Sequence, residues 1–283
     1  MDSDYAQNIL IKTMQEGAIP IHVAFIMDGN RRYSKVHGMT IAEGLFRGSQ
    51  AMTKVVERCF LLGIRGVTWY TFSIENFKRP KEQIDPVMEV LKYLFVNYAQ
   101  PGGLLERHQC AIRVLGRLDL LDDDMRETID IATKQSCHQT KRFLNVYLAY
   151  TSRDEIARAV RVSAEECCRG KISPTAITAQ SLAARMYAVD DPPVDLLVRT
   201  SGVRRMSDFL LWQCHQDTDI QVVDTLWPDF GLRDLFFVIV RWQRNQCHVD
   251  LQKPNIGFLV TCFIFVFMSL SSWFYSLLTK LFE

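Results

Sequence analysis

Short apolar runs recur along the chain, and longer segments with apolar residues at helical spacing separate them. The runs have the length and the β-branched or aromatic content of strands, and they cover residues 22–27, 67–72, 111–115, 143–149, 195–199 and 220–223. The separating segments include predicted amphipathic helices over 41–62, from Asp85-Pro86 onward, over 122–135 and over 153–168. This alternation predicts an α/β fold with a single central, mostly parallel six-stranded sheet flanked by helices.

The C-terminal segment departs from this pattern. No charged residue occurs from Pro254 to Thr279, and Lys253 and Lys280 flank that stretch. Because a helix needs about 20 apolar residues to cross the hydrocarbon core, we expect a C-terminal hydrophobic helix embedded in a membrane. A buried helix and a hairpin that enters one leaflet are the alternatives. The expected organisation is an N-terminal arm, a main domain and a hydrophobic membrane-associated tail, over residues 1–20, 21–250 and 251–283.

Composition narrows the classes of partner. The net charge of +1 gives no electrostatic footprint for nucleic acid, so no nucleic-acid partner is expected. The eight cysteines include no Cys-x-x-Cys pair. Their scatter favours buried thiols in a reducing compartment over a disulfide framework or a zinc site.

Polar residues cluster directly after three of the apolar runs, at 28–32, 73–79 and 199–207. Because the carboxyl ends of parallel strands meet at the edge of a sheet where ligands bind, we expect one shared site. Gly29 lets the backbone approach an anion, and the arginines of the clusters add positive charge. Asp28 is an oxygen ligand of the kind that Mg²⁺ uses beside phosphates. For the first cluster, an ordinary strand-to-helix turn with solvated arginines is the alternative.

Five motifs, in this order and spacing, resemble the cis-prenyltransferase family: MDGNRR, FSIENFKRP, DLLVRTSG, RMSDFLLWQ and LWPDF. The resemblance covers roughly residues 20–245, and the doubled arginine of the first motif is similar to the eukaryotic branch. It implies an enzyme that joins isopentenyl diphosphate to an allylic diphosphate such as farnesyl diphosphate. The implied product is a long-chain polyprenyl diphosphate, such as dehydrodolichyl diphosphate for dolichol and protein glycosylation.

The resemblance also implies roles for single residues. Asp28 is the implied essential carboxylate, which works with Mg²⁺ and the diphosphate. Ser73 and Asn76 are implied to lie near the reacting carbons, with Asn76 in the proton-transfer step. Because an amide is a poor base, the diphosphate or a water molecule is an alternative proton acceptor. The other implied substrate-binding residues hold the allylic diphosphate, orient neighbours or clamp isopentenyl diphosphate, and they are Gly29, Asn30, Arg31, Arg32, Tyr33, Glu75, Phe77, Arg79, Arg199, Arg205 and Ser207.

Two positions depart from the family pattern. The family usually has Arg where Ile41 stands and His where Leu45 stands, and both normally help to hold a diphosphate. Arg47 is a candidate substitute on the same predicted helix. These losses leave open a weakly active or altered enzyme.

Two further segments have a structural and a functional interpretation. In the family, helices of this region wall a hydrophobic tunnel for the growing chain. The helix expected after Asp85-Pro86 offers an apolar face made of Val87, Leu91, Leu94, Phe95 and Tyr98. Core packing explains the same face. The LWPDF motif, residues 226–230, is predicted to be structural and to lie at or near a subunit contact.

An absent motif implies a partner. Single-subunit members of the family carry an Arg-x-Gly motif near the C-terminus, whereas Arg233, Arg241 and Arg244 are not followed by x-Gly. The resemblance therefore implies a related, non-catalytic subunit that supplies the motif, with an interface near residues 220–245. It also implies an endoplasmic reticulum membrane with the catalytic domain on the cytosolic side. A self-sufficient homodimer that uses Arg241 or Arg244 is the alternative.

Two other function classes stay open. The chain could be a non-catalytic scaffold or regulatory subunit of the same complex, although such partners typically lack the Asp-Gly-Asn loop that is present at residues 28–30. It could also be an unrelated phosphohydrolase with Asp28 as nucleophile. That chemistry needs a second nearby carboxylate, as in Asp-x-Asp, whereas Gly29 and Asn30 follow Asp28 here.

Overall fold

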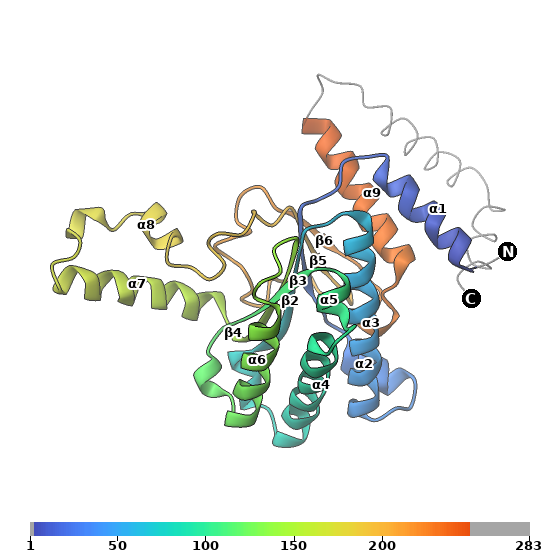
Figure 1. The fold of residues 1–283 in the computed structure, drawn as a ribbon, viewed down its shortest axis with the longest axis horizontal. Coiled ribbons are helices and arrows are strands. Elements are labelled where there is room, and N and C mark those ends of the chain that lie inside the picture. Colours follow the sequence, from blue (N-terminus) through green and yellow to red (C-terminus); the bar gives the residue numbers. More distant parts are fainter. Residues whose placement is uncertain (1–2, 250–283) are drawn as a thin grey trace.

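One parallel sheet organises the molecule. The computed structural model describes residues 3–249, with side chains described for residues 7–246. Six strands lie in the order β3-β4-β2-β1-β5-β6, and every neighbouring pair is parallel (Figure 1). They are β1 (His22–Ile26), β2 (Gly66–Ser73), β3 (Cys110–Leu115), β4 (Arg142–Tyr150), β5 (Leu196–Arg199) and β6 (Asp219–Val222). The predicted α/β fold is confirmed, and the sheet is entirely parallel.

Helices connect the strands. They are α1 (Ser3–Gln15), α2 (Asn30–Val36), α3 (Ile41–Leu62), α4 (Lys81–Ala99), α5 (Leu104–Arg107), α6 (Asp123–Ser136), α7 (Ser152–Cys168), α8 (Ala179–Ala183) and α9 (Leu232–Val249). The helices expected over 41–62, 122–135 and 153–168 are present. The expected C-terminal hydrophobic helix lies outside the described residues. Within residues 3–249, no helix combines the length and the apolar character that a membrane crossing needs.

The helix expected to start at Asp85-Pro86 begins earlier. Helix α4 starts at Lys81, and Pro80 stands directly before it with φ near −55°. The Gln83 N–H donates to the Pro80 carbonyl at 2.9 Å. Pro80 thus provides the start signal, because its fixed φ suits the residue that leads into a helix. Pro86 lies inside the helix, where its missing N–H costs one backbone hydrogen bond.

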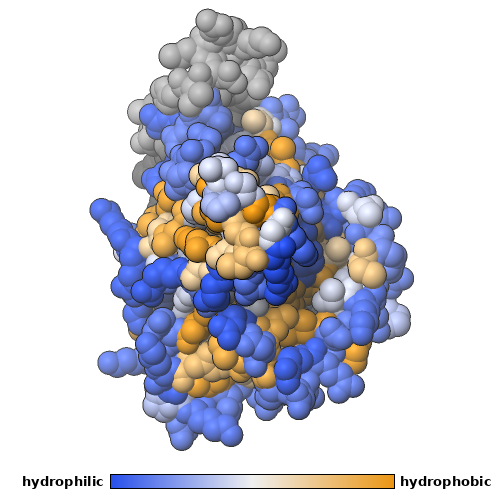
Figure 2. All heavy atoms as spheres, turned by 90° about the vertical axis from the view of Figure 1, so that its left-hand side faces the viewer, coloured by the Kyte–Doolittle hydropathy of each residue, from blue (hydrophilic) through white to orange (hydrophobic). Residues whose placement is uncertain are grey.

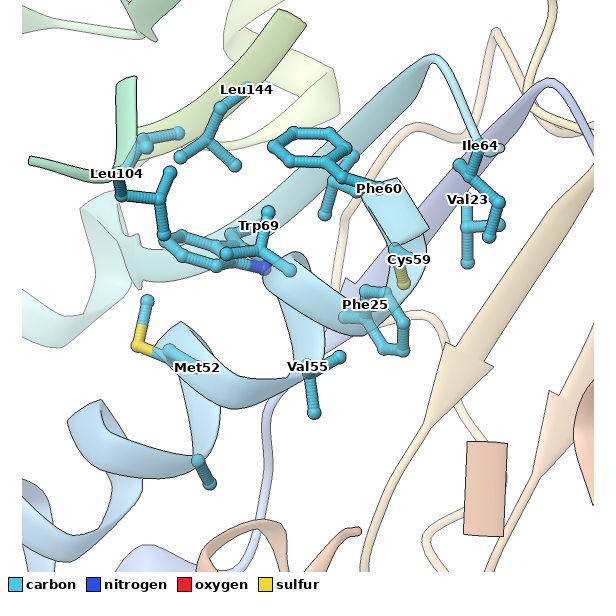
Figure 3. Close-up of a cluster of buried hydrophobic side chains, with 14 of the residues drawn as sticks. Val23, Phe25, Met52, Val55, Cys59, Phe60, Ile64, Trp69, Leu104 and Leu144 are labelled. Carbon is cyan, nitrogen blue, oxygen red and sulfur yellow. The ribbon is translucent and has the colours of Figure 1, made fainter. Parts of the chain in front are cut away.

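Helices cover one face of the sheet. Val23 and Phe25 of β1 and Trp69 of β2 are fully buried there. Figure 3 shows them beside Met52, Val55 and Cys59 of α3 and below Phe60 of the same helix. Alternate strand residues point to this face, as the period of a strand requires. This packing fixes α3 against β1 and β2, whose carboxyl ends carry two of the predicted clusters.

The segment that follows α8 covers the opposite face. Ala24, Ile26 and Tyr70 pack there against Phe209 and its neighbours. The rings of Tyr70 and Phe209 stack with their centroids 4.4 Å apart. The Tyr70 hydroxyl donates to the carbonyl of Ser207 at 3.2 Å. These contacts tie the loop after β5 to the carboxyl end of β2.

A close contact joins α3 to the loop after β1. A Cβ atom at Gly48 would lie 2.3 Å from Asn30 Oδ1, so only glycine permits this approach. The N-terminus of α3 is fixed by a capping box, in which Thr40 and Glu43 each accept a hydrogen bond from the other's N–H. The polar loop at 28–30 is therefore held against a rigid helix.

Helices α7 and α8 lie at one end of the molecule, and α1 and α9 lie on the other side (Figure 1). Helices α7 and α8 project from the sheet away from the other helices (Figure 1). Seen from that end, apolar side chains gather in the middle of the surface with polar ones around them (Figure 2). On the other side, α1 packs against α3 and α9. The Gln243 side chain of α9 donates to the carbonyls of Met14 and Ala18 at 2.8 and 2.7 Å, which fixes the end of the arm.

Candidate active site

The predicted clusters meet in one cavity at the carboxyl ends of β1, β2 and β5. Its volume is about 600 Å³, and α3 and α4 form one wall. Most of the predicted site residues line it, namely Asp28, Gly29, Asn30, Arg31, Arg32, Ser73, Glu75, Asn76, Arg79, Arg199, Arg205 and Ser207. Strand order explains the meeting, because β1 lies between β2 and β5 in the sheet. The arrangement places the Asp28 carboxylate among several guanidinium groups.

Asp28 and Arg199 form the centre of the cavity. Arg199 Nη2 donates to Asp28 Oδ2 at 2.7 Å, and Nη1 donates to Ser207 Oγ at 2.6 Å. Nη1 also donates to the Arg205 carbonyl. The Arg199 side chain is only 4% exposed, whereas that of Asp28 is 34% exposed. The buried Arg199 therefore holds Arg205 and Ser207 in place through its hydrogen bonds, and the Asp28 carboxylate faces the cavity.

The backbone of Asp28 is fixed as firmly as its side chain. Its N–H donates to Thr200 Oγ1 at 2.9 Å, and that hydroxyl donates to the Asp28 carbonyl at 2.6 Å. The Trp227 N–H donates to the same carbonyl at 3.1 Å. Trp227 is buried, and its indole N–H donates to the Gly48 carbonyl at 2.9 Å. The predicted structural role of the segment 226–230 is thus confirmed.

Electrostatics keep Asp28 ionised. Partial burial raises the pKa of the Asp28 carboxyl. The hydrogen bond and charge of Arg199, the Gly29 N–H and the charge of Arg32 act in the other direction and prevail, so the pKa lies below its ordinary value. At neutral pH, Asp28 is therefore a permanent negative charge in a positively charged cavity.

The chain turns sharply into α2 at Gly29. Its φ of 115° lies in the left-handed region, which favours glycine. A Cβ atom here would also approach the Leu226 backbone to 3.1 Å. From the first turn of α2, the Arg31 guanidinium reaches Gln83 Oε1 of α4 at 3.3 Å. Its charge contributes to lowering the pKa of Arg79, after the larger effect of burial.

Ser73 and Asn76 form a tight turn at the end of β2. The Ser73 N–H donates to Asn76 Oδ1 at 3.1 Å, and Ser73 Oγ accepts from the Glu75 N–H at 3.2 Å. The Asn76 amide oxygen thus holds the turn, which leaves its Nδ2 group as a donor for other partners. Asn76 is therefore better suited to orient an acceptor oxygen than to remove a proton.

Two charged residues of the cavity were not predicted from the sequence. Arg153 and Asp208 line it and form an ion pair, with Nε 2.6 Å from Oδ2. Arg153 follows the carboxyl end of β4, which neighbours β2. The sequence feature that could have identified Arg153 is a fourth polar cluster, at residues 151–154, directly after the apolar run at 143–149. Asp208 lies in a loop with several left-handed residues, among them Ser207 and Leu210, and in the sequence it belongs to the motif RMSDFLLWQ.

Other predicted residues lie at the border of the cavity or behind it. Glu75 is exposed at the rim, and its hydrogen bond and ion pair with Lys78 lower its pKa. The Tyr33 ring stacks on His37 with centroids 4.0 Å apart, and the Phe77 ring packs on Phe72 at 5.0 Å. Neither Tyr33 nor Phe77 lines the cavity, so their predicted substrate contacts stay predictions.

The two departures from the family pattern lie in the cavity wall. Ile41 and Leu45 both line the cavity, whereas Arg47 lines a separate groove on the outer side of α3. Arg47 is therefore not placed to replace the lost side chains. On α4, Val87 lines the cavity, and Leu91, Leu94, Phe95 and Tyr98 are buried in the core.

Comparisons relate the chain to known proteins. Residues 26–250 match the family model for undecaprenyl diphosphate synthase. A dehydrodolichyl diphosphate synthase complex subunit of Schizosaccharomyces pombe is 39% identical over 244 residues, which cover 86% of this chain and 92% of that protein. A human dehydrodolichyl diphosphate synthase complex subunit is 42% identical over 243 residues, which cover 86% of this chain and 72% of the human protein.

A solved structure has the same fold. Lavandulyl diphosphate synthase from Lavandula x intermedia, in complex with dimethylallyl diphosphate, aligns with a TM-score of 0.75 at 27% identity. The alignment covers 79% of this chain and 95% of that chain. The likeness thus extends from sequence motifs to the whole sheet and its helices. The chain belongs to the cis-prenyltransferase family and is a prenyltransferase.

Proposed function

We propose that this prenyltransferase joins isopentenyl diphosphate to an allylic diphosphate, such as farnesyl diphosphate, and repeats the step to make a long-chain dehydrodolichyl-type diphosphate. The relatives from Schizosaccharomyces pombe and human carry the name of such a synthase. The observation that carries the proposal is the Asp28–Arg199 pair in a cavity rich in arginine. A site of this kind binds two diphosphates and stabilises the charge that develops on a leaving one.

In this proposal Asp28 holds Mg²⁺ together with substrate oxygens. Among residues 3–249, no group of three or more His, Cys, Asp or Glu side chains could hold a metal ion by itself. A single ionised carboxylate still fits Mg²⁺, which is often bound by one or two carboxylates together with phosphates and water. When bound, the ion neutralises charge on the departing diphosphate. Asp28 supplies an ionised carboxylate that faces the cavity.

The two diphosphates have separate binding groups in the proposal. The loop at 28–30 with Arg31, Arg32 and Arg79 holds the allylic diphosphate. Arg205 and Ser207 hold isopentenyl diphosphate, because the buried Arg199 fixes both of them through its hydrogen bonds. Guanidinium groups suit this task, since each can donate two parallel hydrogen bonds to phosphate oxygens.

In each cycle the double bond of isopentenyl diphosphate supplies the electrons for a new carbon–carbon bond to the allylic carbon, and the C–O bond breaks with its electrons leaving on the diphosphate. One C–H bond of the isopentenyl part then breaks, and its electrons form the new double bond while the proton leaves. Asn76 Nδ2 orients a diphosphate oxygen, and Ser73 keeps Asn76 in place. The proton passes to a diphosphate oxygen or a water, because an amide is a poor base.

A second subunit is part of the proposal. Both named relatives are subunits of a complex, and this chain lacks an Arg-x-Gly motif after Phe230. A related, non-catalytic partner is proposed to supply the motif at an interface near residues 220–245. In this region β6 is an edge strand of the sheet, and the side chain of Ile220 on this strand is exposed. The Gln221 side chain ties β6 to α9 by donating to the Val238 carbonyl at 3.1 Å.

The proposed location is the endoplasmic reticulum membrane, with the catalytic domain on the cytosolic side. The uncharged stretch from Pro254 to Thr279 supports membrane association, although it lies outside the described residues. The three-part organisation into arm (1–20), catalytic domain (21–250) and tail (251–283) belongs to the same proposal.

The test is prenyl transfer by the complex. Full-length chain, co-expressed with a candidate partner subunit, is incubated with labelled isopentenyl diphosphate and farnesyl diphosphate with and without Mg²⁺. Long-chain polyprenyl products that require Mg²⁺ are expected. A complex that assembles but transfers no prenyl group would contradict the proposal. Such a result would favour the second candidate function, a weakly active or non-catalytic subunit. The observation that supports this candidate is the presence of the apolar residues Ile41 and Leu45 in the cavity wall.

A further inference from the structure

Arg153 and Asp208 form an ion pair in the wall of the cavity, outside the groups proposed to hold the two diphosphates. Arg153 lies in the first turn of α7, directly after the carboxyl end of β4, and Asp208 lies in the loop after β5. Both line the cavity. Arg153 Nε donates to Asp208 Oδ2 at 2.6 Å. The Arg153 side chain is 73% exposed, whereas that of Asp208 is only 14% exposed, so the carboxylate is the fixed member of the pair.

The guanidinium of Arg153 keeps most of its donors available. Arginine carries a planar fork of N–H donors, and Asp208 engages only Nε. Nη2 lies 4.0 Å from Glu75 Oε1, which is longer than a hydrogen bond. Within the part of the chain that the structure describes, neither Nη1 nor Nη2 has a hydrogen-bond partner. The open side of the guanidinium can therefore donate two parallel hydrogen bonds to a phosphate group in the cavity.

Asp208 also fixes the loop after β5 to the start of α7. Its Oδ1 atom accepts from the Arg153 N–H at 3.2 Å, and its carbonyl accepts from the Ser152 N–H at 2.8 Å. Ser207 and Asp208 have φ values of 52° and 60°, in the left-handed region. Because residues with a side chain disfavour that region, the loop depends on such contacts for its shape. Asp208 therefore holds both Arg153 and the neighbouring Ser207.

The same loop brings Ser207 across the sheet toward Arg153. Strand β4 neighbours β2, whereas β5 lies on the far side of β1. The Tyr70 hydroxyl lies 3.2 Å from the Ser207 carbonyl and 3.1 Å from the carbonyl of Tyr150, the last residue of β4. Arg199 Nη1 donates to Ser207 Oγ at 2.6 Å, which leaves the Ser207 O–H as a donor. Ser207 and the guanidinium of Arg153 thus lie at one side of the cavity.

We infer that Arg153 is a further binding residue for isopentenyl diphosphate and that Asp208 is its positioning residue. The inference rests on the proposed function and adds Arg153 to the side chains of Arg205 and Ser207. The Nη groups of Arg153 and the hydroxyl of Ser207 donate to phosphate oxygens, and Asp208 fixes the spacing between these donors. Because the ion pair is formed before substrate arrives, binding requires little further ordering of Arg153. An ion pair that is structural only and never contacts substrate is the alternative.

Equilibrium binding tests the inference without turnover. Isopentenyl diphosphate alone cannot undergo the proposed step, so calorimetric titration of the complex of full-length chain and partner gives its Kd. We expect Arg153→Gln to raise this Kd about tenfold, because hydrogen bonds from a charged donor are lost, and to change the Kd of farnesyl diphosphate by less than about twofold. Arg169→Gln is the matched control and should act like the wild type. Arg169 lies at the other end of α7, is exposed, pairs with Glu165 and does not line the cavity.

Two results would overturn the role of Arg153. Unchanged affinity of Arg153→Gln for isopentenyl diphosphate would show that no binding group was lost. An equal loss of affinity for both diphosphates would indicate a structural defect of the cavity. If the wild-type complex binds isopentenyl diphosphate but transfers no prenyl group, the proposed function fails, while the Kd values still decide the role of Arg153.

Substitutions of Asp208 test the positioning role. Asp208→Asn keeps a side-chain oxygen that accepts from Arg153, whereas Asp208→Ala removes it. We expect Asp208→Ala to raise KM for isopentenyl diphosphate several-fold with a smaller effect on kcat, and Asp208→Asn to recover most of the affinity. Initial rates of the complex at saturating farnesyl diphosphate measure both constants. A KM of Asp208→Ala equal to that of the wild type, or equal losses in the two variants, would show that Asp208 does not position Arg153 through its side-chain oxygen.

Discussion

Arg199 lies beneath Asp28 and donates to its Oδ2 atom at 2.7 Å. The register of the sheet creates this pair, because Arg199 is the register partner of Ile26, and Asp28 follows two residues later. The buried guanidinium fixes one oxygen of the carboxylate, and the rest of Asp28 faces the cavity. A charge that is oriented in this way before substrate arrives costs little reorganisation during the reaction.

Removing this charge should stop prenyl transfer. Asp28→Asn keeps the size of the side chain but removes its negative charge. We expect turnover of the complex to fall about a thousandfold or more, which corresponds to roughly 4 kcal/mol in the barrier. Steady-state rates with labelled isopentenyl diphosphate measure this. Asp119→Asn, at an exposed surface ion pair, is the control and should act like the wild type. Near-normal turnover of Asp28→Asn would refute the role of Asp28.

Arg205 should distinguish the two diphosphate sites. Its side chain is exposed to the cavity, and only its carbonyl is engaged by Arg199. Arg205→Ala should therefore keep the fold and raise KM for isopentenyl diphosphate more than KM for the allylic substrate. Initial rates with each substrate varied in turn measure both constants. An equal rise in the two constants would show that the proposed division of the sites is wrong.

The sequence predicts the sheet and most of the cavity because their signals are local. A buried parallel strand is a short apolar run, and its polar end marks the ligand edge, so the clusters after β1, β2 and β5 could be predicted. Arg153 could have been predicted in the same way from the end of β4. Asp208 belongs to the motif RMSDFLLWQ, but the strand pattern does not indicate that it lines the cavity, because its position depends on the packing of Phe209 against Tyr70, far away in the sequence.

Other features depend on which side of a helix faces the site. Arg47 and Leu45 lie two residues apart on α3, yet only Leu45 lines the cavity. Pattern alone does not fix the rotation of a helix to that accuracy. The same limit applies to Phe77, which packs on Phe72 although its neighbour Asn76 lines the cavity.

A buried histidine should make the stability depend on pH. His22 Nε2 lies 2.7 Å from Thr68 Oγ1, and Nδ1 lies 2.9 Å from the Pro192 carbonyl. Burial lowers the pKa of His22 below its ordinary value, although Pro192, Asp191 and Asp195 act in the opposite direction. The unfolded chain therefore binds a proton more readily than the folded protein. Stability should be highest above about pH 6.5 and fall as the pH drops below it.

Urea unfolding near pH 7.5 and pH 5.5 tests this dependence. The unfolding free energy of the wild type should decrease between the two, and His22→Gln should lose less on the same acidification even if it is less stable at both. The control is His138→Gln, because His138 is exposed. If His22→Gln shows the same pH dependence as the wild type, the buried imidazole is not the group responsible.

The C-terminal tail should hold the protein on membranes. A chain that ends at Lys253 lacks the whole uncharged stretch from Pro254 to Thr279. We expect it to move from the membrane pellet to the supernatant after high-speed centrifugation and to keep prenyl transfer when the partner is supplied. Full-length chain in the same lysate is the reference. Full-length protein that stays in the supernatant would exclude the anchor.

The chain alone should be nearly inactive. After Phe230, neither Arg241 nor Arg244 is followed by x-Gly, so we expect no complete diphosphate site without a partner that supplies the motif. Expression in a host that has no such partner, followed by the prenyl-transfer assay, measures this directly. Co-expression with the partner should restore robust synthesis. In that complex, Arg241→Ala and Arg244→Ala should change catalysis little, because the partner's motif and not these side chains supplies the missing diphosphate-binding group. Robust synthesis by the chain alone, lost in either variant, would instead establish a self-sufficient homodimer.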